Sequence, residues 1–257
     1  MESPDSVTLV RHAQSEYNIL AAKKEADPEY QEFRVAYEAD MTSPETRALA
    51  QKMKNKLTTG IGDYETRLTE EGVRQAKIVG ESLRQQIPCP DFIFVSPHFR
   101  TRETLRLMSD VWPELQGVPT MIEGLVREHS YGIGVRYNDW RIFQVFHPEQ
   151  KEYRDLATPY FYQYPQGESV ANVRDRLEIF KQKHFQQCAG KNVLIISHHR
   201  AILSFVANEQ GMSPEEFIRV DADQPPVNCG VTLYKGNPNP GKDSKLELEF
   251  YNKQLWT

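Results

Sequence analysis

Two arginines and two histidines follow short apolar segments of the chain, and their side chains are suited to binding and transferring an anionic group. The segments and residues are 7–10 followed by Arg11 and His12, 91–96 followed by Arg100, and 192–197 followed by His198. Arginine holds phosphate oxygens bidentately and stays charged at any working pH. Histidine acts as a nucleophile or as a hydrogen-bond donor near neutral pH. Together the four side chains would form a phosphate site.

The three apolar segments are predicted to be buried strands of a parallel sheet. Each is rich in Val, Ile or Phe, and none alternates cleanly between polar and apolar residues. This composition is typical of strands that helices cover on both faces. Ligands bind at the carboxyl ends of the strands in such sheets. Neighbouring parallel strands would therefore deliver all four side chains to one edge.

Helical patterns separate the predicted strands. Thr69 is predicted to cap a helix that extends to Ile87, because two glutamates follow it and apolar residues then recur at helical spacing. Three further helices are predicted near Arg100, Ser169 and Arg200. Period-two alternation predicts a β-hairpin or a pair of late strands at 230–234 and 246–250. Alternating strands and helices predict a layered α/β domain.

The segment 19–66 differs from the rest because it is strongly polar and helix-prone. Asp27 and Ser43 are each followed by a proline. Each pair is typical of an N-cap residue with proline at the first helical position, so two helices are predicted. We expect one domain over 1–257, with this segment as a helical insertion. Because it begins just after Arg11 and His12, we expect it to cap the site and select substrates.

Composition narrows the functional class. The 257 residues are 39% hydrophobic and 26% charged, which is ordinary for a globular protein. A net charge of −5 argues against a nucleic-acid-binding surface over the whole protein. Three widely spaced cysteines predict reduced thiols. With no predicted membrane span or secretory signal, we expect a cytoplasmic protein without nucleic-acid or membrane partners, and its oligomeric state stays open.

Six motifs, in chain order, resemble those of the histidine phosphatase superfamily, also called the phosphoglycerate-mutase-like family. They are RHAQSEYN (11–18), LTEEG with the following QA (68–76), SPHFR with Thr104 (96–104), LVREHSYG (125–132), PQGES (165–169) and VLIISH (193–198). Together they extend over nearly the whole chain except 19–66. The resemblance implies a three-layer α/β/α fold with a mostly parallel central sheet.

The resemblance also implies roles for six residues. They are the nucleophile His12, the proton donor Glu128, the second catalytic histidine His198, which also belongs to the phosphate pocket, and the phosphate ligands Arg11, Arg100 and Asn18. It implies a metal-independent histidine acid phosphatase, or phosphomonoesterase, that needs no cofactor, because arginine and histidine supply the positive charge. The expected substrate is a phosphorylated small molecule or a phosphoprotein. To act as an acid near neutrality, Glu128 would need a buried or phosphate-facing setting.

Three residues near the motifs raise questions about the site. Ala13 and His199 each replace a glycine that is usual in the family. We expect Ala13 to be tolerated, and His199 to narrow the pocket or contact substrate. His98 lies near the cluster but is expected to face away, because Arg100 is the better anion ligand. The many aromatic residues of 133–164 are expected mainly to pack.

Two alternatives to a phosphatase remain open. One is a phosphoglycerate mutase-type phosphotransferase, although the paired arginines and the lysine that hold the substrate carboxylate in mutases have no counterpart here. The other is a catalytically weak, phosphate-binding pseudophosphatase, supported only by Ala13 and His199.

Overall fold

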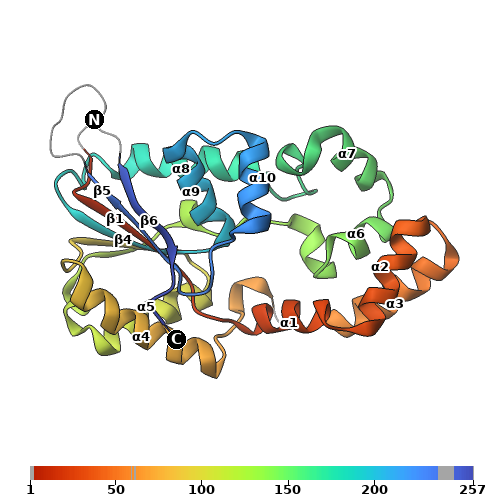
Figure 1. The fold of residues 1–257 in the computed structure, drawn as a ribbon, viewed down its shortest axis with the longest axis horizontal. Helices are drawn as coiled ribbons and strands as arrows, with labels where there is room; N and C mark the ends of the chain where they lie inside the picture. Colours follow the sequence, from red (N-terminus) through yellow and green to blue (C-terminus); the bar gives the residue numbers. More distant parts are fainter. Residues whose placement is uncertain (1–2, 59, 61, 237–245, 257) are drawn as a thin grey trace. The chain divides into compact units, whose positions relative to one another are not determined.

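The computed structural model describes residues 3–58, 60, 62–236 and 246–256. The chain divides into two compact units (Figure 1). The first unit contains the segment up to Ser15, Tyr64–Glu128 and the segment from Asn172 onward, and the second contains Glu16–Asp63 and His129–Ala171. Each unit is described by itself below.

The first unit is built on a six-stranded sheet in the order β3-β2-β4-β1-β5-β6. The strands are β1 (Ser6–Arg11), β2 (Phe92–Val95), β3 (Thr120–Ile122), β4 (Asn192–Ser197), β5 (Val231–Lys235) and β6 (Glu247–Lys253). The first four run parallel, and β5 and β6 pair antiparallel at one edge. The three predicted parallel strands are thus neighbours, and the two late strands are confirmed. Residues 237–245, in the turn-rich stretch between those strands, lie outside the described residues.

Helices cover both faces of the sheet (Figure 1). One face carries α4 (Glu70–Gln86) and α5 (Phe99–Val111), and the other carries α8 (Val170–His184) and α9 (His199–Gln210). Adjacent residues of β4 pack in opposite directions: Leu194 joins the core formed with α4 and α5, whereas Ile195 joins the core formed with α8 and α9. The predicted three-layer α/β/α fold with a mostly parallel sheet is confirmed.

Local cap chemistry sets where helix α4 begins. Thr69 is its N-cap, and the Thr69 hydroxyl accepts a hydrogen bond from the Gly72 amide at 3.0 Å.

Two elements of the first unit were not predicted. One is β3, which is short and exposed along its length. The other is α10 (Pro214–Asp223), which begins with a capping box between Ser213 and Glu216. Short 3-10 turns occur at Asp63–Glu65, Pro113–Gly117, Gly124–Val126 and Gly132–Tyr137.

The second unit is helical. It contains α1 (Glu16–Glu25), α2 (Pro28–Asp40), α3 (Pro44–Leu57), α6 (Trp140–Phe146) and α7 (Glu149–Phe161). Asp27 and Ser43 cap α2 and α3 with their side chains, as predicted. Residues of α2 and α3 share one buried cluster with Ile142 and Val145 of α6. The segment 19–66 therefore builds its core jointly with the aromatic-rich segment that follows residue 129.

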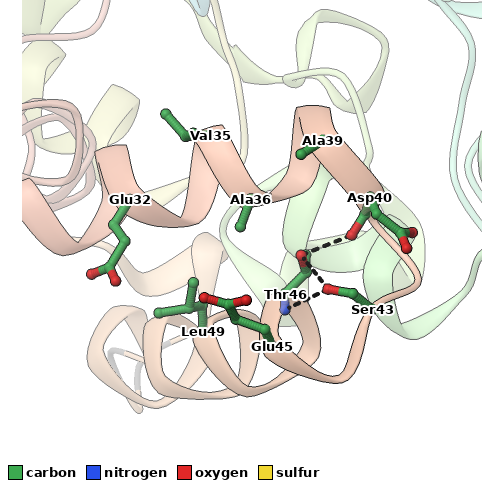
Figure 2. Close-up of a pocket in the computed structure, with 9 residues that line it drawn as sticks. All are labelled: Glu32, Val35, Ala36, Ala39, Asp40, Ser43, Glu45, Thr46 and Leu49. Carbon is green, nitrogen blue, oxygen red and sulfur yellow. Dashed lines mark hydrogen bonds between the residues drawn. The ribbon is translucent and has the colours of Figure 1, made fainter.

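An open cavity of about 520 Å³ lies between α2 and α3 (Figure 2). Its walls combine small apolar residues with polar and acidic ones. The lining residues are Glu32, Val35, Ala36, Ala39, Asp40, Ser43, Glu45, Thr46 and Leu49. None of these nine residues is basic, so the cavity is not suited to an anionic ligand.

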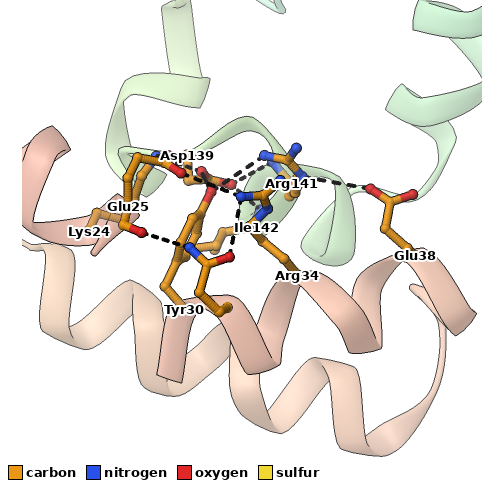
Figure 3. Close-up of polar contacts among 9 residues, drawn as sticks. Lys24, Glu25, Tyr30, Arg34, Glu38, Asp139, Arg141 and Ile142 are labelled. Carbon is orange, nitrogen blue, oxygen red and sulfur yellow. Dashed lines mark hydrogen bonds and ion pairs between the residues drawn. The ribbon is translucent and has the colours of Figure 1, made fainter. Parts of the chain in front are cut away.

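A buried carboxylate joins α1 and α2 to the start of α6 (Figure 3). Asp139 Oδ1 accepts hydrogen bonds from the backbone amides of Arg141 and Ile142, at 2.8 and 3.1 Å. Asp139 Oδ2 accepts from Lys24 Nζ at 2.8 Å and from the Tyr30 hydroxyl at 2.5 Å. Both carboxylate oxygens are thus occupied by donors of the same unit.

Among the described residues, no helix is both long and apolar enough to cross a membrane.

Candidate active site

The central strands bring the predicted histidines together. In the register of β1 and β4, Arg11 lies opposite Ser197. His12 and His198 are therefore the first residues after the ends of these two strands. The His12 amide donates to the Ser197 carbonyl at 2.9 Å. The two imidazole rings are 5.1 Å apart between centroids, in an edge-to-face arrangement. The carboxyl ends of these neighbouring strands therefore deliver two buried histidines to one place.

His12 is held with a defined ring orientation. Its Nδ1 lies 2.8 Å from the Ala13 carbonyl oxygen. Because a carbonyl only accepts, Nδ1 carries the proton, and the Nε2 lone pair is left available. Burial, together with the positive charges of Arg100 and Arg11, holds the pKa of His12 well below its ordinary value of 6.5. The ring is therefore neutral at pH 7, as a nucleophile must be.

Ala13 fits the loop without the glycine that is usual in the family. It is fully buried, and its backbone is not in the positive-φ region where glycine is favoured. The Ala13 amide donates to Thr104 Oγ1 at 3.0 Å, and that hydroxyl donates to the Arg100 carbonyl at 2.7 Å. The alanine thus ties the loop after His12 to helix α5.

The two arginines are buried or half-buried beside the histidines. Arg100 lies in the first turn of α5 and is buried, and its charge lowers the pKa of both His12 and His198. Arg11 donates through Nη1 to the Pro226 carbonyl at 2.6 Å. Its Nε is buried and has no hydrogen-bond partner among the described residues. Burial lowers the pKa of Arg11 to about 10, while the nearby Glu128 opposes that shift.

Glu128 lies at the same edge of the sheet. It is half-buried, and its Oε1 accepts a hydrogen bond of 3.2 Å from the Arg200 amide in the first turn of α9. The segment before it is fixed by Ser197 Oγ, which donates to the Val126 carbonyl at 2.7 Å. It is also fixed by Arg176, which donates to the Glu128 carbonyl at 3.1 Å. A carboxyl group therefore lies within electrostatic reach of Arg11.

Five of the six predicted site residues thus belong to the first unit and gather at the carboxyl ends of β1, β2 and β4. They are Arg11, His12, Arg100, Glu128 and His198. The sixth, Asn18, is a half-buried residue of α1 in the second unit. Its role as a phosphate ligand stays a prediction.

A family comparison decides what kind of protein carries this arrangement. The family described as the histidine phosphatase superfamily (branch 1) matches residues 38–241, which is most of the chain. The protein belongs to the histidine phosphatase superfamily. The matched range begins after the motif at 11–18, so that motif rests on the geometry described above.

Relatives of this histidine phosphatase superfamily member carry phosphoglycerate mutase and mutase-like names. The phosphoglycerate mutase-like protein AT74 of Arabidopsis thaliana is 26% identical over 255 residues, covering 96% of this chain. The chain spans only 65% of that relative's length, which is less than two thirds. The 2,3-bisphosphoglycerate-dependent phosphoglycerate mutase of Bifidobacterium longum is 26% identical, covering 65% of this chain and 76% of its own.

A solved structure with the same fold is the alpha-ribazole phosphatase of Shigella flexneri. It superposes with a TM-score of 0.65 at 17% identity and covers 97% of this chain and 96% of its own. At that identity the likeness concerns the fold alone.

The expectation that His98 faces away from the cluster is wrong. His98 is buried, its ring lies 4.7 Å from the His198 ring, and its Nδ1 is 3.2 Å from Ser96 Oγ. The same hydroxyl lies 2.7 Å from His198 Nε2. The available signal was the spacing of Ser96 and His98, because residues two apart in an extended segment point to the same side. Both side chains are buried next to His198.

His199 is engaged by an acidic residue of α10. Its Nε2 is 2.8 Å from Asp221 Oδ1, and Arg200 Nη2 is 3.1 Å from Asp221 Oδ2. Burial opposes ionisation of Asp221, but the close His199 ring and the charge of Arg200 hold its pKa at about 2. Sequence reasoning missed Asp221, because the residue lies in α10, a helix that was not predicted. The expected contact of His199 with substrate stays a prediction.

Proposed function

We propose that this protein is a phosphatase that hydrolyses phosphomonoesters through a phosphohistidine on His12. The observation that carries the proposal is the state of that ring. Its Nδ1 proton is held by the Ala13 carbonyl at 2.8 Å, and burial beside two arginines keeps it neutral. Nε2 is therefore a nucleophile that needs no separate base.

The first step transfers the phosphoryl group to the protein. The His12 Nε2 lone pair forms the N–P bond while the bond from phosphorus to the ester oxygen breaks. Glu128, in its protonated form, gives its proton to the leaving oxygen. The alcohol leaves, and the products are phosphohistidine and the Glu128 carboxylate.

The second step returns the protein to its starting state. The Glu128 carboxylate takes a proton from a water molecule, whose oxygen attacks phosphorus as the N–P bond breaks. Inorganic phosphate leaves, His12 recovers its lone pair and Glu128 is protonated again. The net reaction consumes one ester and one water and releases one alcohol and one phosphate.

Fixed positive groups stabilise the charge that gathers on the equatorial phosphoryl oxygens. Arg11 and Arg100 supply guanidinium groups, and His198 supplies a ring donor. We propose Asn18 as an additional ligand. The chemistry of these residues is sufficient for transfer without a metal ion. The half-buried position of Glu128, at the same edge of the sheet as His12, supports its role as the acid.

The substrate is proposed to be a phosphorylated small molecule or a phosphoprotein. Relatives named as phosphoglycerate mutases support the first class. A phosphate-release screen over sugar phosphates, nucleotides, phosphorylated headgroups and phosphopeptides would rank these classes.

A trapping experiment tests the chemistry. The protein is incubated with a radiolabelled phosphomonoester and quenched in alkali, and the label is expected to be acid-labile and located on His12. His12→Ala should lose both label and hydrolysis, whereas His147→Ala, which alters a histidine of the second unit, should retain both. Equal labelling of wild type and His12→Ala would exclude the proposed nucleophile.

A mutase is the second candidate because several curated relatives carry that name. A coupled mutase assay is run beside the phosphate-release assay. Phosphoryl return to a phosphoglycerate acceptor, faster than release to water, would replace the phosphatase proposal. Phosphate binding without any turnover would instead favour a pseudophosphatase.

A further inference from the structure

We infer that His98 is a positioning residue that acts through the Ser96 hydroxyl and holds His198 in the ring tautomer that points an N–H at the phosphoryl group. This inference rests on the proposed phosphate-binding role of His198. It assigns a new role to a histidine outside the six predicted site residues.

The three side chains form a continuous hydrogen-bonded chain inside the first unit. Ser96 Oγ lies 2.7 Å from His198 Nε2 and 3.2 Å from His98 Nδ1. Ser96 and His198 are fully buried, and His98 is 8% exposed. Because Ser96 is fully buried, its one hydroxyl proton goes to one of the two rings, and the other ring donates to Ser96 Oγ.

Two arrangements of this hydrogen-bonded chain give the Ser96 proton an acceptor; if both rings donated to Ser96 Oγ, its proton would have no acceptor among the described residues. A serine hydroxyl donates one hydrogen bond and accepts others. In the first arrangement, His98 Nδ1–H donates to Ser96 Oγ, whose proton goes to His198 Nε2, and the His198 proton then resides on Nδ1. In the second, every bond is reversed, and His198 Nδ1 is left as a bare lone pair.

The unused nitrogen of His198 selects the first arrangement. His198 Nδ1 is buried and has no hydrogen-bond partner among the described residues. A bare lone pair there would repel an incoming phosphoryl oxygen, whereas an N–H would donate to it. Burial and the charge of Arg100 lower the pKa of His198 well below its ordinary value. The ring is therefore neutral, and only its tautomer decides whether Nδ1 is a donor.

The surroundings of His98 fix its side chain next to Ser96. His98 is the N-cap residue of α5, yet its side chain makes no capping hydrogen bond and turns to Ser96 instead. The Tyr64 ring lies 4.9 Å from the His98 ring. Thr101 Oγ1 lies 2.8 Å from the Ser96 carbonyl oxygen and 2.7 Å from the His98 carbonyl oxygen, so its one proton is held between the two. The turn that carries both residues is thereby fixed.

The direct test reads the tautomer without needing turnover. In protein labelled with ¹⁵N-histidine, two-bond ¹H–¹⁵N spectra should report His198 as the Nδ1–H form. His98→Leu, or Ser96→Ala, should shift the ring toward a mixture of tautomers. Observation of the Nε2–H form in the wild type, or no change in either variant, would overturn the inference.

A pair of size-matched variants separates hydrogen bonding from packing. His98→Asn places an amide N–H near the position of Nδ1, so it should keep the tautomer and stay within a few-fold of wild-type kcat/KM. His98→Leu fills the same space without a hydrogen-bond donor. We expect kcat/KM to fall by about 10–100-fold, as when a group that hydrogen-bonds the second nitrogen of a functional histidine is removed. Equal activity of the two variants would contradict the role.

The two proposals fail in different ways. If His12→Ala abolishes hydrolysis while His98→Leu and His98→Asn behave alike, only the positioning role is lost. If wild-type protein does not hydrolyse phosphomonoesters but the His98 variants alter the His198 tautomer, only the phosphatase proposal is lost.

Discussion

The two units of this protein bury charge in different ways. In the second unit, the Asp139 carboxylate accepts four hydrogen bonds, two from backbone amides and two from Lys24 and Tyr30. In the first unit, Arg11 Nε and His198 Nδ1 are buried without a hydrogen-bond partner among the described residues. The Asp139 carboxylate is fully hydrogen-bonded within its unit, whereas two side-chain nitrogen atoms of the first unit stay open.

The contrast separates a structural polar cluster from a binding site. A buried donor without a partner costs about 1–3 kcal/mol, so such donors are rare unless a ligand or ordered water will meet them. Arg11 Nε and His198 Nδ1 lie among the side chains that would bind phosphate. The occupied carboxylate of the second unit stabilises the junction of α1, α2 and α6. Substitutions should therefore affect activity in the first cluster and stability in the second.

The largest effect is expected at Glu128. Glu128→Gln keeps an acceptor for the Arg200 amide but removes the proton donor, so kcat/KM for an alkyl phosphate should fall by about 10²–10⁴-fold. A nitrophenyl phosphate, whose leaving group needs no proton, should lose far less. Unfolding in urea should be almost unchanged. A similar loss for both substrates would show that Glu128 is not the acid.

The next effect concerns Asp139. Asp139→Ala removes the partner of Lys24, whose side chain is only 13% exposed, and leaves Tyr30 and two amides without an acceptor. The free energy of unfolding should fall by about 3–5 kcal/mol. Glu38→Ala is the matched control, because Glu38 is an exposed partner of Arg141 at 3.9 Å and should cost little. A loss below 1 kcal/mol, by urea titration, would contradict the structural role of this carboxylate.

A smaller, pH-dependent effect is expected at Asp221. Its pKa is lowered from 3.8 to about 2 in the folded protein, so the ionised form stabilises the fold above pH 4. That stability is lost as the pH falls toward 2. At pH 7, Asp221→Asn should cost about 2 kcal/mol, and the difference from wild type should shrink in acid. Asp223→Asn, on an exposed residue of the same helix, should show no such pH dependence in thermal unfolding.

The smallest effect compares two helix caps. Ser43 caps α3 in the second unit, and Thr69 caps α4 in the first. Alanine at either position should cost about 1 kcal/mol of stability. Thr69 Oγ1 also lies 2.8 Å from Gln14 Oε1, in the loop after His12, so Thr69→Ala should also reduce kcat/KM. Loss of activity in Ser43→Ala of the same size would remove the distinction between the units.

Features governed by neighbouring residues were predictable from the sequence. The caps Asp27, Ser43 and Thr69 were identified because capping depends on residues within one turn. The buried strands were identified because a run of apolar β-branched residues has few alternatives in a layered fold. By contrast, β3 has only three residues, all exposed, and α10 is short, so neither produced an apolar pattern. The shared core of α2, α3 and α6 joins segments about a hundred residues apart, which no local pattern reports.

The sequence by itself determined the kind of chemistry, since arginines and histidines after buried strands are suited to phosphate. Only the tertiary structure decided which atoms are available for it. His12 has a free Nε2 because its Nδ1 meets the Ala13 carbonyl, and His198 has an unoccupied Nδ1 because its Nε2 meets Ser96. A ring's protonated nitrogen depends on its hydrogen-bond partners. For His198 that partner comes from another strand, so only the folded chain sets it.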